Sequence, residues 1–232
     1  EPALSSLEIK IKSGQFIGVV GESGSGKTTL SHLLQRFLEP TNGKVTIGST
    51  DLSELSTNQV HEIIGSVSHT AHLFEGTIFS NLQIASDSLT EDVARDVLKF
   101  VRLDEFSSNL YAPVSSEGVN LSSGQRQKLA IARMLLKDPQ IMIFDEATAN
   151  IDQQSENDIF HMMKELKMEG KTLIVITHRL HNVINSDSIL MLERGELIEQ
   201  GTHEQMMQQK GKYAHLYEEQ QSLETLQFEI GA

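Results

Sequence analysis

The run Gly21-Glu22-Ser23-Gly24-Ser25-Gly26-Lys27-Thr28 lies near the N-terminus and matches the pattern GxxxxGK[ST] in full. It follows the apolar residues 16–20, which are typical of a buried central strand, and it opens the helix-like residues 27–38. In such a loop, glycines allow backbone N–H groups to surround a polyphosphate, the lysine adds a positive charge, and the threonine hydroxyl can bind Mg²⁺. The run therefore predicts a site for a nucleoside triphosphate.

The composition excludes several other classes of protein. The chain has 232 residues, and its 19 Lys+Arg against 32 Asp+Glu give a net charge of −13, which argues against a nucleic-acid binder. It has no Cys, so disulfide and thiol chemistry are excluded. Its apolar runs are far shorter than the roughly 20 residues that cross a bilayer. The length fits one domain with a sizeable insertion.

The hydrophobic pattern outside the glycine-rich run alternates between strands and helices. Alternation predicts a half-buried strand at residues 7–12, and short apolar runs predict strands at 45–47, 63–67, 141–144, 172–176, 189–192 and 197–199. Residues 193–196 have the composition of a hairpin turn. Helical periodicity is found at residues 78–82, 91–101 and 124–137 and again in the tail from residue 202. The simplest arrangement is an α/β core that a helical insertion interrupts.

Two acidic residues, Asp145 and Glu146, follow the strand-like residues 141–144. In enzymes with a phosphate-binding loop, a carboxylate at the first of these positions holds Mg²⁺, and a following Glu can orient or deprotonate the attacking water. The alternative is a solvated strand end without function, and the phosphate loop counts against it. The acidic pair therefore indicates hydrolysis.

A second short run, Leu121-Ser122-Ser123-Gly124-Gln125, precedes a predicted helix. Ser122 and Gln125 have the spacing of a capping box, so local physics alone favours a well-capped helix as their role. However, the run ends about 20 residues before Asp145, and this spacing matches that of a known family.

Together these runs resemble the ATP-binding cassette family, the nucleotide-binding domains of membrane transporters, along essentially the whole chain. Residues 147–152, Ala-Thr-Ala-Asn-Ile-Asp, look like the D-loop of the family, and residues 177–180, Thr-His-Arg-Leu, contain its switch histidine. Residues 73–78 and 199–204 resemble exporters rather than importers. The resemblance implies a P-loop NTPase (RecA-like) α/β core, residues 1–68 and 138–232, with an antiparallel β portion near the N-terminus. It places an inserted helical subdomain, which carries the signature, at residues 69–137.

The resemblance also implies roles for single residues. Lys27 and the loop amides would hold the β- and γ-phosphates of ATP, Thr28 and Asp145 would hold Mg²⁺, Glu146 would be the general base, and His178 would contact the γ-phosphate and the attacking water. The residues expected to contact the nucleotide are Gly21, Glu22, Ser23, Gly24, Ser25, Gly26, Lys27, Thr28, Thr29, Ser122, Ser123, Gly124, Gln125 and Asp152. Family members pair head to tail, so the signature residues would come from a second nucleotide-binding domain, of the same or a different chain, and Asp152 would couple the two sites.

Four features differ from the family pattern, one of which is the lack of the Gly-Glu pair that exporters commonly show at Ser115 and Ser116. His69 stands where the family has a glutamine that contributes an oxygen to Mg²⁺. An imidazole is a poorer ligand for this hard cation, so we hypothesise weakened Mg²⁺ dependence and an altered pH response, against the alternative of a tolerated hinge residue. Ser123 replaces a signature glycine but keeps its amide. An adenine-stacking aromatic would lie upstream of Glu1, so the chain is expected to be truncated and to bind ATP weakly, because base stacking is worth about 1–3 kcal/mol.

The implied function is the ATPase motor of an exporter, at the cytoplasmic face of the cell membrane, with transmembrane domains fused upstream. A degenerate regulatory half of a heterodimer is an alternative, since His69 and Ser123 depart from the pattern. A further alternative is a soluble ATPase of the same family that acts on DNA or ribosomes, but the net charge of −13 argues against this alternative.

Overall fold

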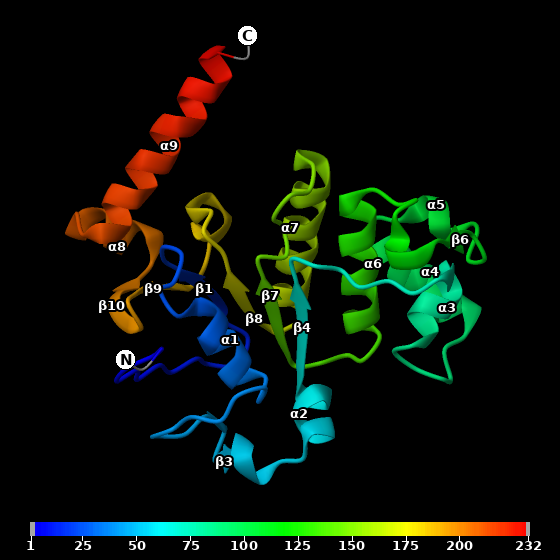
Figure 1. The fold of residues 1–232 in the computed structure, drawn as a ribbon, viewed down its shortest axis with the longest axis horizontal. Helices are drawn as coiled ribbons and strands as arrows, with labels where there is room; N and C mark the ends of the chain where they lie inside the picture. The colour runs from blue at the N-terminus through cyan, green and yellow to red at the C-terminus, as the bar shows by residue number, and fades with distance from the viewer. Residues whose placement is uncertain (1–2, 231–232) are drawn as a thin grey trace.

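A six-stranded sheet forms the centre of the computed structural model, which describes residues 3–230 (Figure 1). The strand order is β10-β9-β1-β8-β7-β4, in which β10 is antiparallel to β9 and the other neighbours are parallel. These strands are β1 (Phe16–Val20), β4 (Ile64–Ser68), β7 (Ile141–Asp145), β8 (Thr172–Ile176), β9 (Ser188–Glu193) and β10 (Glu196–Gly201). The predicted α/β core is therefore confirmed.

Helices cover both faces of this sheet. They are α1 (Lys27–Leu34), α2 (Thr57–Ile63), α3 (Ile78–Gln83), α4 (Glu91–Phe100), α5 (Asp104–Ser107), α6 (Ser123–Leu135), α7 (Gln153–Met168), α8 (His203–Gln209) and α9 (Lys212–Ile230). Three 3₁₀ helices are η1 (Leu52–Glu54), η2 (Ser116–Gly118) and η3 (Leu180–Val183). Helices α3 to α6 gather on the β4 side of the sheet, and α9 extends away from α8 at the opposite end (Figure 1). Within residues 3–230, every helix is too short or too polar to span a bilayer.

Two hydrophobic clusters lie on the two faces of the sheet. Leu173 and Val175 of β8 belong to the cluster that also contains the buried faces of α6 and α7. Ile174 and Ile176 belong to the other cluster, together with Leu30 of α1. Successive side chains of a strand point to opposite faces, so a strand covered on both faces is mostly apolar; all five residues of β8 are buried, and four of them are apolar.

The antiparallel elements are smaller than the sequence predicts. β2 (Thr46–Ile47) pairs with β3 (Thr50–Asp51), and β5 (Gly76–Thr77) pairs with β6 (Pro113–Val114). The strand prediction at residues 7–12 is wrong for the backbone, since no strand is assigned there. The alternation nevertheless has a physical basis, because Leu7, Ile9 and Ile11 pack on the α1 side of the core while the residues between them are exposed.

Helix α1 ends at Leu34, before the predicted residue 38. Arg36 adopts a left-handed conformation (φ 56°), and the Phe37 N–H bonds the carbonyl of His32 at 2.8 Å, which is the bonding pattern of a Schellman motif. Phe37 is therefore 58% exposed rather than buried on a continuing helix. The predicted hairpin at residues 193–196 is confirmed, since positive φ at Arg194 and Gly195 joins β9 to β10.

Candidate functional site

The sheet register brings the predicted site residues to one edge. Ser68, Asp145 and Ile176 are partners across β4, β7 and β8, and Ile176 is also the partner of Val19 in β1. All four strands are parallel, so their carboxyl ends meet, and ligands of open α/β sheets bind at that edge. The segments that follow these strands contain His69, Glu146, His178 and the phosphate loop, residues 21–28.

The phosphate loop adopts a conformation that requires glycine at two positions. Gly26 is the N-cap of α1 with φ 102°, which L side chains rarely adopt. A Cβ at Gly21 would lie 2.2 Å from the Leu192 carbonyl oxygen of β9. The loop thus lies directly on the sheet edge and leads into the N-terminus of an eight-residue helix, where backbone N–H groups are available to an anion.

Lys27 points back into the loop. Its Nζ donates to the carbonyl oxygens of Gly21 at 2.7 Å and Glu22 at 2.8 Å. Burial lowers the pKa of Lys27, and the nearby charges of Glu146 and Asp145 oppose that change. The lysine therefore lies within electrostatic reach of the acidic pair that the sequence predicts to act with it.

Asp145 is the last residue of β7 and is partly buried. Burial is the main cause that raises its pKa, and the charge of Glu146 adds to this, whereas a hydrogen bond from Ser31 and the charges of His32 and His69 lower it. His69 therefore lies close enough to act on Asp145 electrostatically. Sequence reasoning missed Ser31, although its position one helical turn after Lys27 on α1 is a signal that could have found it.

Glu146 and His178 contact each other directly. Glu146 turns out of β7 with a left-handed φ of 52°, and its N–H bonds the Ile176 carbonyl at 2.8 Å. Its Oε2 lies 2.8 Å from Nδ1 of His178. The His178 side chain is 60% exposed, which leaves it open to a ligand. A carboxylate held against an imidazole beside a phosphate loop is an arrangement that can activate and orient water.

The signature run caps helix α6. The Ser122 hydroxyl accepts the Gln125 N–H at 3.1 Å, and Gln125 Oε1 accepts the Ser122 N–H at 2.8 Å, so the predicted capping box is confirmed. A Cβ at Gly124 would lie 2.0 Å from Oγ of Ser155, and glycine is needed there for α6 to pack against α7. Ser123 lies at the first position of the helix and is partly exposed.

Asp152 lies beside the signature of its own chain. It is the N-cap of α7 and accepts the Ser155 N–H at 2.9 Å, which lowers its pKa. Its Oδ2 lies 2.9 Å from a Cβ built on Gly124. No hydrogen bond or ion pair in the described part of the chain joins Ser122 or Gly124 to the phosphate loop.

Next to His178 in the chain, Arg179 belongs to a polar network around the buried Glu156, which sequence reasoning missed. Glu156 of α7 accepts two bonds from Arg179, both at 3.0 Å, and one from Asn182 at 3.1 Å. Asn182 also donates to the Thr148 hydroxyl at 3.1 Å. This network ties residues 147–152 to residues 177–180, the two runs that resemble the D-loop and the switch of the cassette family.

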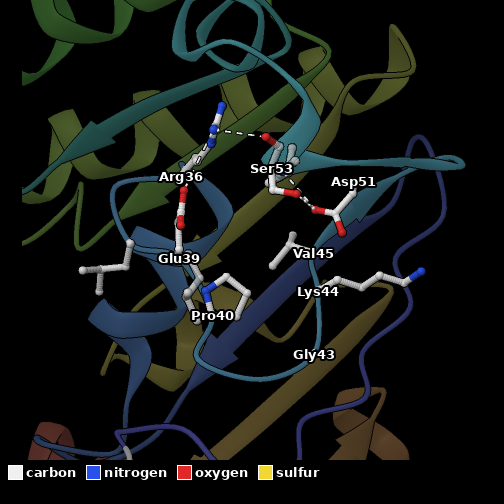
Figure 2. A pocket seen from close by; sticks show the side chains of 11 residues that line it. Arg36, Glu39, Pro40, Gly43, Lys44, Val45, Asp51 and Ser53 are labelled. Atoms are coloured by element: carbon white, nitrogen blue, oxygen red, sulfur yellow. Dashed lines mark hydrogen bonds and ion pairs between the residues drawn. The ribbon is translucent and has the colours of Figure 1, made fainter.

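A pocket beyond the end of α1 lies apart from this site (Figure 2). Arg36 donates there to the Ser53 carbonyl at 3.2 Å, and Asp51 accepts the Ser53 N–H at 2.9 Å. Neither the phosphate loop nor the acidic pair lines it.

Residues 4–149, which include the phosphate loop, the signature run and the acidic pair, match the model of the ABC transporter family. The chain belongs to the ABC transporter family. An uncharacterized ABC transporter ATP-binding protein of Haemophilus influenzae is 37% identical over 229 residues, which are 97% of this chain and 41% of that protein. An ATP-dependent lipid A-core flippase of Ralstonia nicotianae is 40% identical over 222 residues, 93% of this chain and 37% of the flippase.

A solved ABC exporter structure agrees with the sequence relatives. An Atm1-family ABC exporter from a bacterium, solved with ATP bound, matches with a TM-score of 0.88 and 33% identity. The match covers 94% of this chain and 39% of the exporter chain. The chain thus has the fold of an ABC ATP-binding domain and spans about two-fifths of the length of the relatives named here.

Proposed function

We propose that this chain hydrolyses ATP and thereby powers export by an ABC transporter. The observation that carries the proposal is the 2.8 Å contact between Glu146 and His178, which lie at the same sheet edge as Lys27. In the proposed step, Glu146 accepts a proton from water as the water oxygen bonds the γ-phosphorus, and the bond to the β-phosphate oxygen breaks to release ADP and phosphate. His178 orients that water and contacts the γ-phosphate.

The remaining site residues have binding roles in this proposal. Lys27 and the loop amides bind the β- and γ-phosphates. Thr28 and Asp145 provide a hydroxyl and a carboxylate, and this oxygen donor set suits Mg²⁺, which neutralises phosphate charge when bound. His69 stands beside Asp145 as an exposed residue and takes the place of the family glutamine.

The proposed assembly contains a second ATP-binding domain and a membrane domain. Residues 69–137 act as the signature-bearing subdomain, and Ser122 and Gly124 of one copy complete the γ-phosphate site of the other. Two of the named relatives are an ATP-dependent flippase and an exporter, both about two and a half times as long as this chain, which supports a transmembrane partner and a place at the cytoplasmic face of a membrane.

Replacement of the proposed base tests the reaction. We expect Glu146→Gln to lower kcat for Mg-ATP hydrolysis by about 10²–10⁴ because the base is lost, while the phosphate loop still binds ATP. Phosphate release and binding of a fluorescent ATP analogue measure the two effects. An unaffected rate would favour the alternative in which this chain is a degenerate regulatory half, an idea to which His69 and Ser123 give some support.

A further inference from the structure

The C-terminal helix α9 contacts the loop that presents the switch histidine. The side-chain amide of Gln220 donates from Nε2 to the carbonyl oxygen of His178 at 2.7 Å. Its Oε1 accepts the backbone N–H of Leu180 at 2.9 Å. One carboxamide thus spans Arg179 and holds both sides of the loop with a donor and an acceptor.

These two bonds satisfy backbone groups at the start of η3. Arg179 is the N-cap of η3 and offers no side-chain cap. The first N–H groups of a helix need an external partner, and Gln220 supplies one for Leu180 from an element 40 residues further along the chain. The imidazole of His178 is mostly exposed, so the backbone of this loop, rather than packing around the ring, determines where Nδ1 lies relative to Glu146.

Helix α9 is itself anchored firmly at its start. Tyr213 is fully buried, and its hydroxyl lies 2.8 Å from Nδ1 of His203 in α8. Lys212 forms ion pairs with Glu193 of β9 and, at 3.2 Å, with Glu22 of the phosphate loop. Gln220 follows this anchor by about two helical turns, or about 12 Å of rise. The helix therefore reaches both loops that the proposed site uses.

We propose that Gln220 is a positioning residue for His178, through which α9 sets the geometry of the Glu146–His178 pair. This inference rests on the proposed function. The carboxamide is the required group, because the loop presents one acceptor and one donor at the same time. Leucine has a similar size but offers neither, and glutamate keeps only the acceptor.

The test measures ATP hydrolysis by the Gln220→Leu and Gln220→Glu variants of this chain. Glu219→Gln, a substitution at the neighbouring exposed residue, is the control. Loss of one or two hydrogen bonds at about 1 kcal/mol each predicts a kcat lower by about 3- to 30-fold in both Gln220 variants. We expect KM for ATP to stay within about twofold, since the phosphate loop is not altered. Glu219→Gln should match the parent. An unchanged kcat in both Gln220 variants would overturn the inference.

A double-mutant cycle separates positioning from a general structural effect. In a His178→Ala background, Gln220→Leu has no histidine to position, so we expect its effect on kcat to disappear. Two results would contradict the inference. One is that Gln220→Leu lowers kcat by the same factor in both backgrounds, and the other is that kcat falls in both Gln220 variants in proportion to a lower thermal midpoint. The parent and Glu146→Gln serve as references: if they hydrolyse ATP equally, the proposed function fails, whereas if only the Gln220 effect is missing, this inference alone fails.

Discussion

Asp145 and Glu146 are adjacent in sequence, yet the structure gives them different surroundings. Asp145 ends β7 and lies against Ser31 of α1, whereas the left-handed φ at Glu146 turns its carboxylate to His178. Two carboxyl groups with different environments can take different roles at one pH. The proposed division into a metal ligand and a base has this physical origin.

The buried carboxyl of Asp145 predicts a pH-dependent cost to stability. Burial raises its pKa, so ionisation costs folding free energy above the pKa of the folded state, and this cost vanishes as pH falls below the unfolded pKa of about 3.9. We expect Asp145→Asn to raise the thermal midpoint of the nucleotide-free chain at pH 7. The gain should shrink as pH is lowered toward 4. Circular dichroism melts over this range measure it, and a lower midpoint at pH 7 would contradict the account.

Residues within motifs could be predicted from sequence, and residues outside them could not. Asp145 and His178 lie at or just after apolar runs, and Lys27 follows another such run by way of the glycine-rich loop, so the pattern implies their placement near the carboxyl ends of parallel strands. Gln220 and Glu156 lie in ordinary polar helices, and the groups that they bond are distant in sequence. Their partners are defined only by tertiary packing, for which a single sequence carries no periodic signal.

At the scale of elements, helix α7 connects the site to the core through one buried acid. The Glu156 side chain is only 10% exposed, and it accepts the bonds of Arg179 and Asn182. Its removal leaves both donors without their acceptor, which costs more than the loss of a solvent-exposed pair.

A matched pair of variants on α7 tests this difference. We expect Glu156→Ala to lower the free energy of unfolding by about 2–3 kcal/mol, because buried hydrogen bonds to a charged group are lost. Glu165→Ala removes the exposed ion pair with Arg102 and should cost about 0–1 kcal/mol. Urea titrations of the two variants measure both values. Equal losses would show that the network around Glu156 contributes no more than a surface pair.

Elements were predictable where the signal is local. The capping box of α6 and the hairpin between β9 and β10 depend on residues close in sequence, and both are confirmed. The end of α1 was missed because Arg36, which breaks the helix, is not a residue that usually adopts a left-handed conformation. Residues 7–12 alternate as a strand does but have no strand assignment, because periodicity reports burial and not backbone pairing.

At the scale of the whole molecule, no hydrogen bond or ion pair among residues 3–230 joins the signature run of the proposed site to the phosphate loop. The phosphate loop and the acidic pair lie at the sheet edge, whereas the signature caps α6 and packs on α7. In the proposed assembly, a two-fold arrangement of two copies would place each signature against the other copy's loop, and such isologous pairing would generate two equivalent sites. The proposed function therefore requires each ATP site to be built from two copies.

Complementation between two inactive variants tests that claim most directly. Lys27→Ala disables the phosphate loop and Ser122→Arg blocks the signature, so each variant alone should hydrolyse little ATP. In a mixture, a heterodimer keeps one site whose loop and signature are both intact. An equimolar mixture should therefore recover up to roughly a quarter of the parent rate, since about half of the dimers carry one of two sites. A mixture that hydrolyses ATP no faster than the average of the two variants alone would contradict the account.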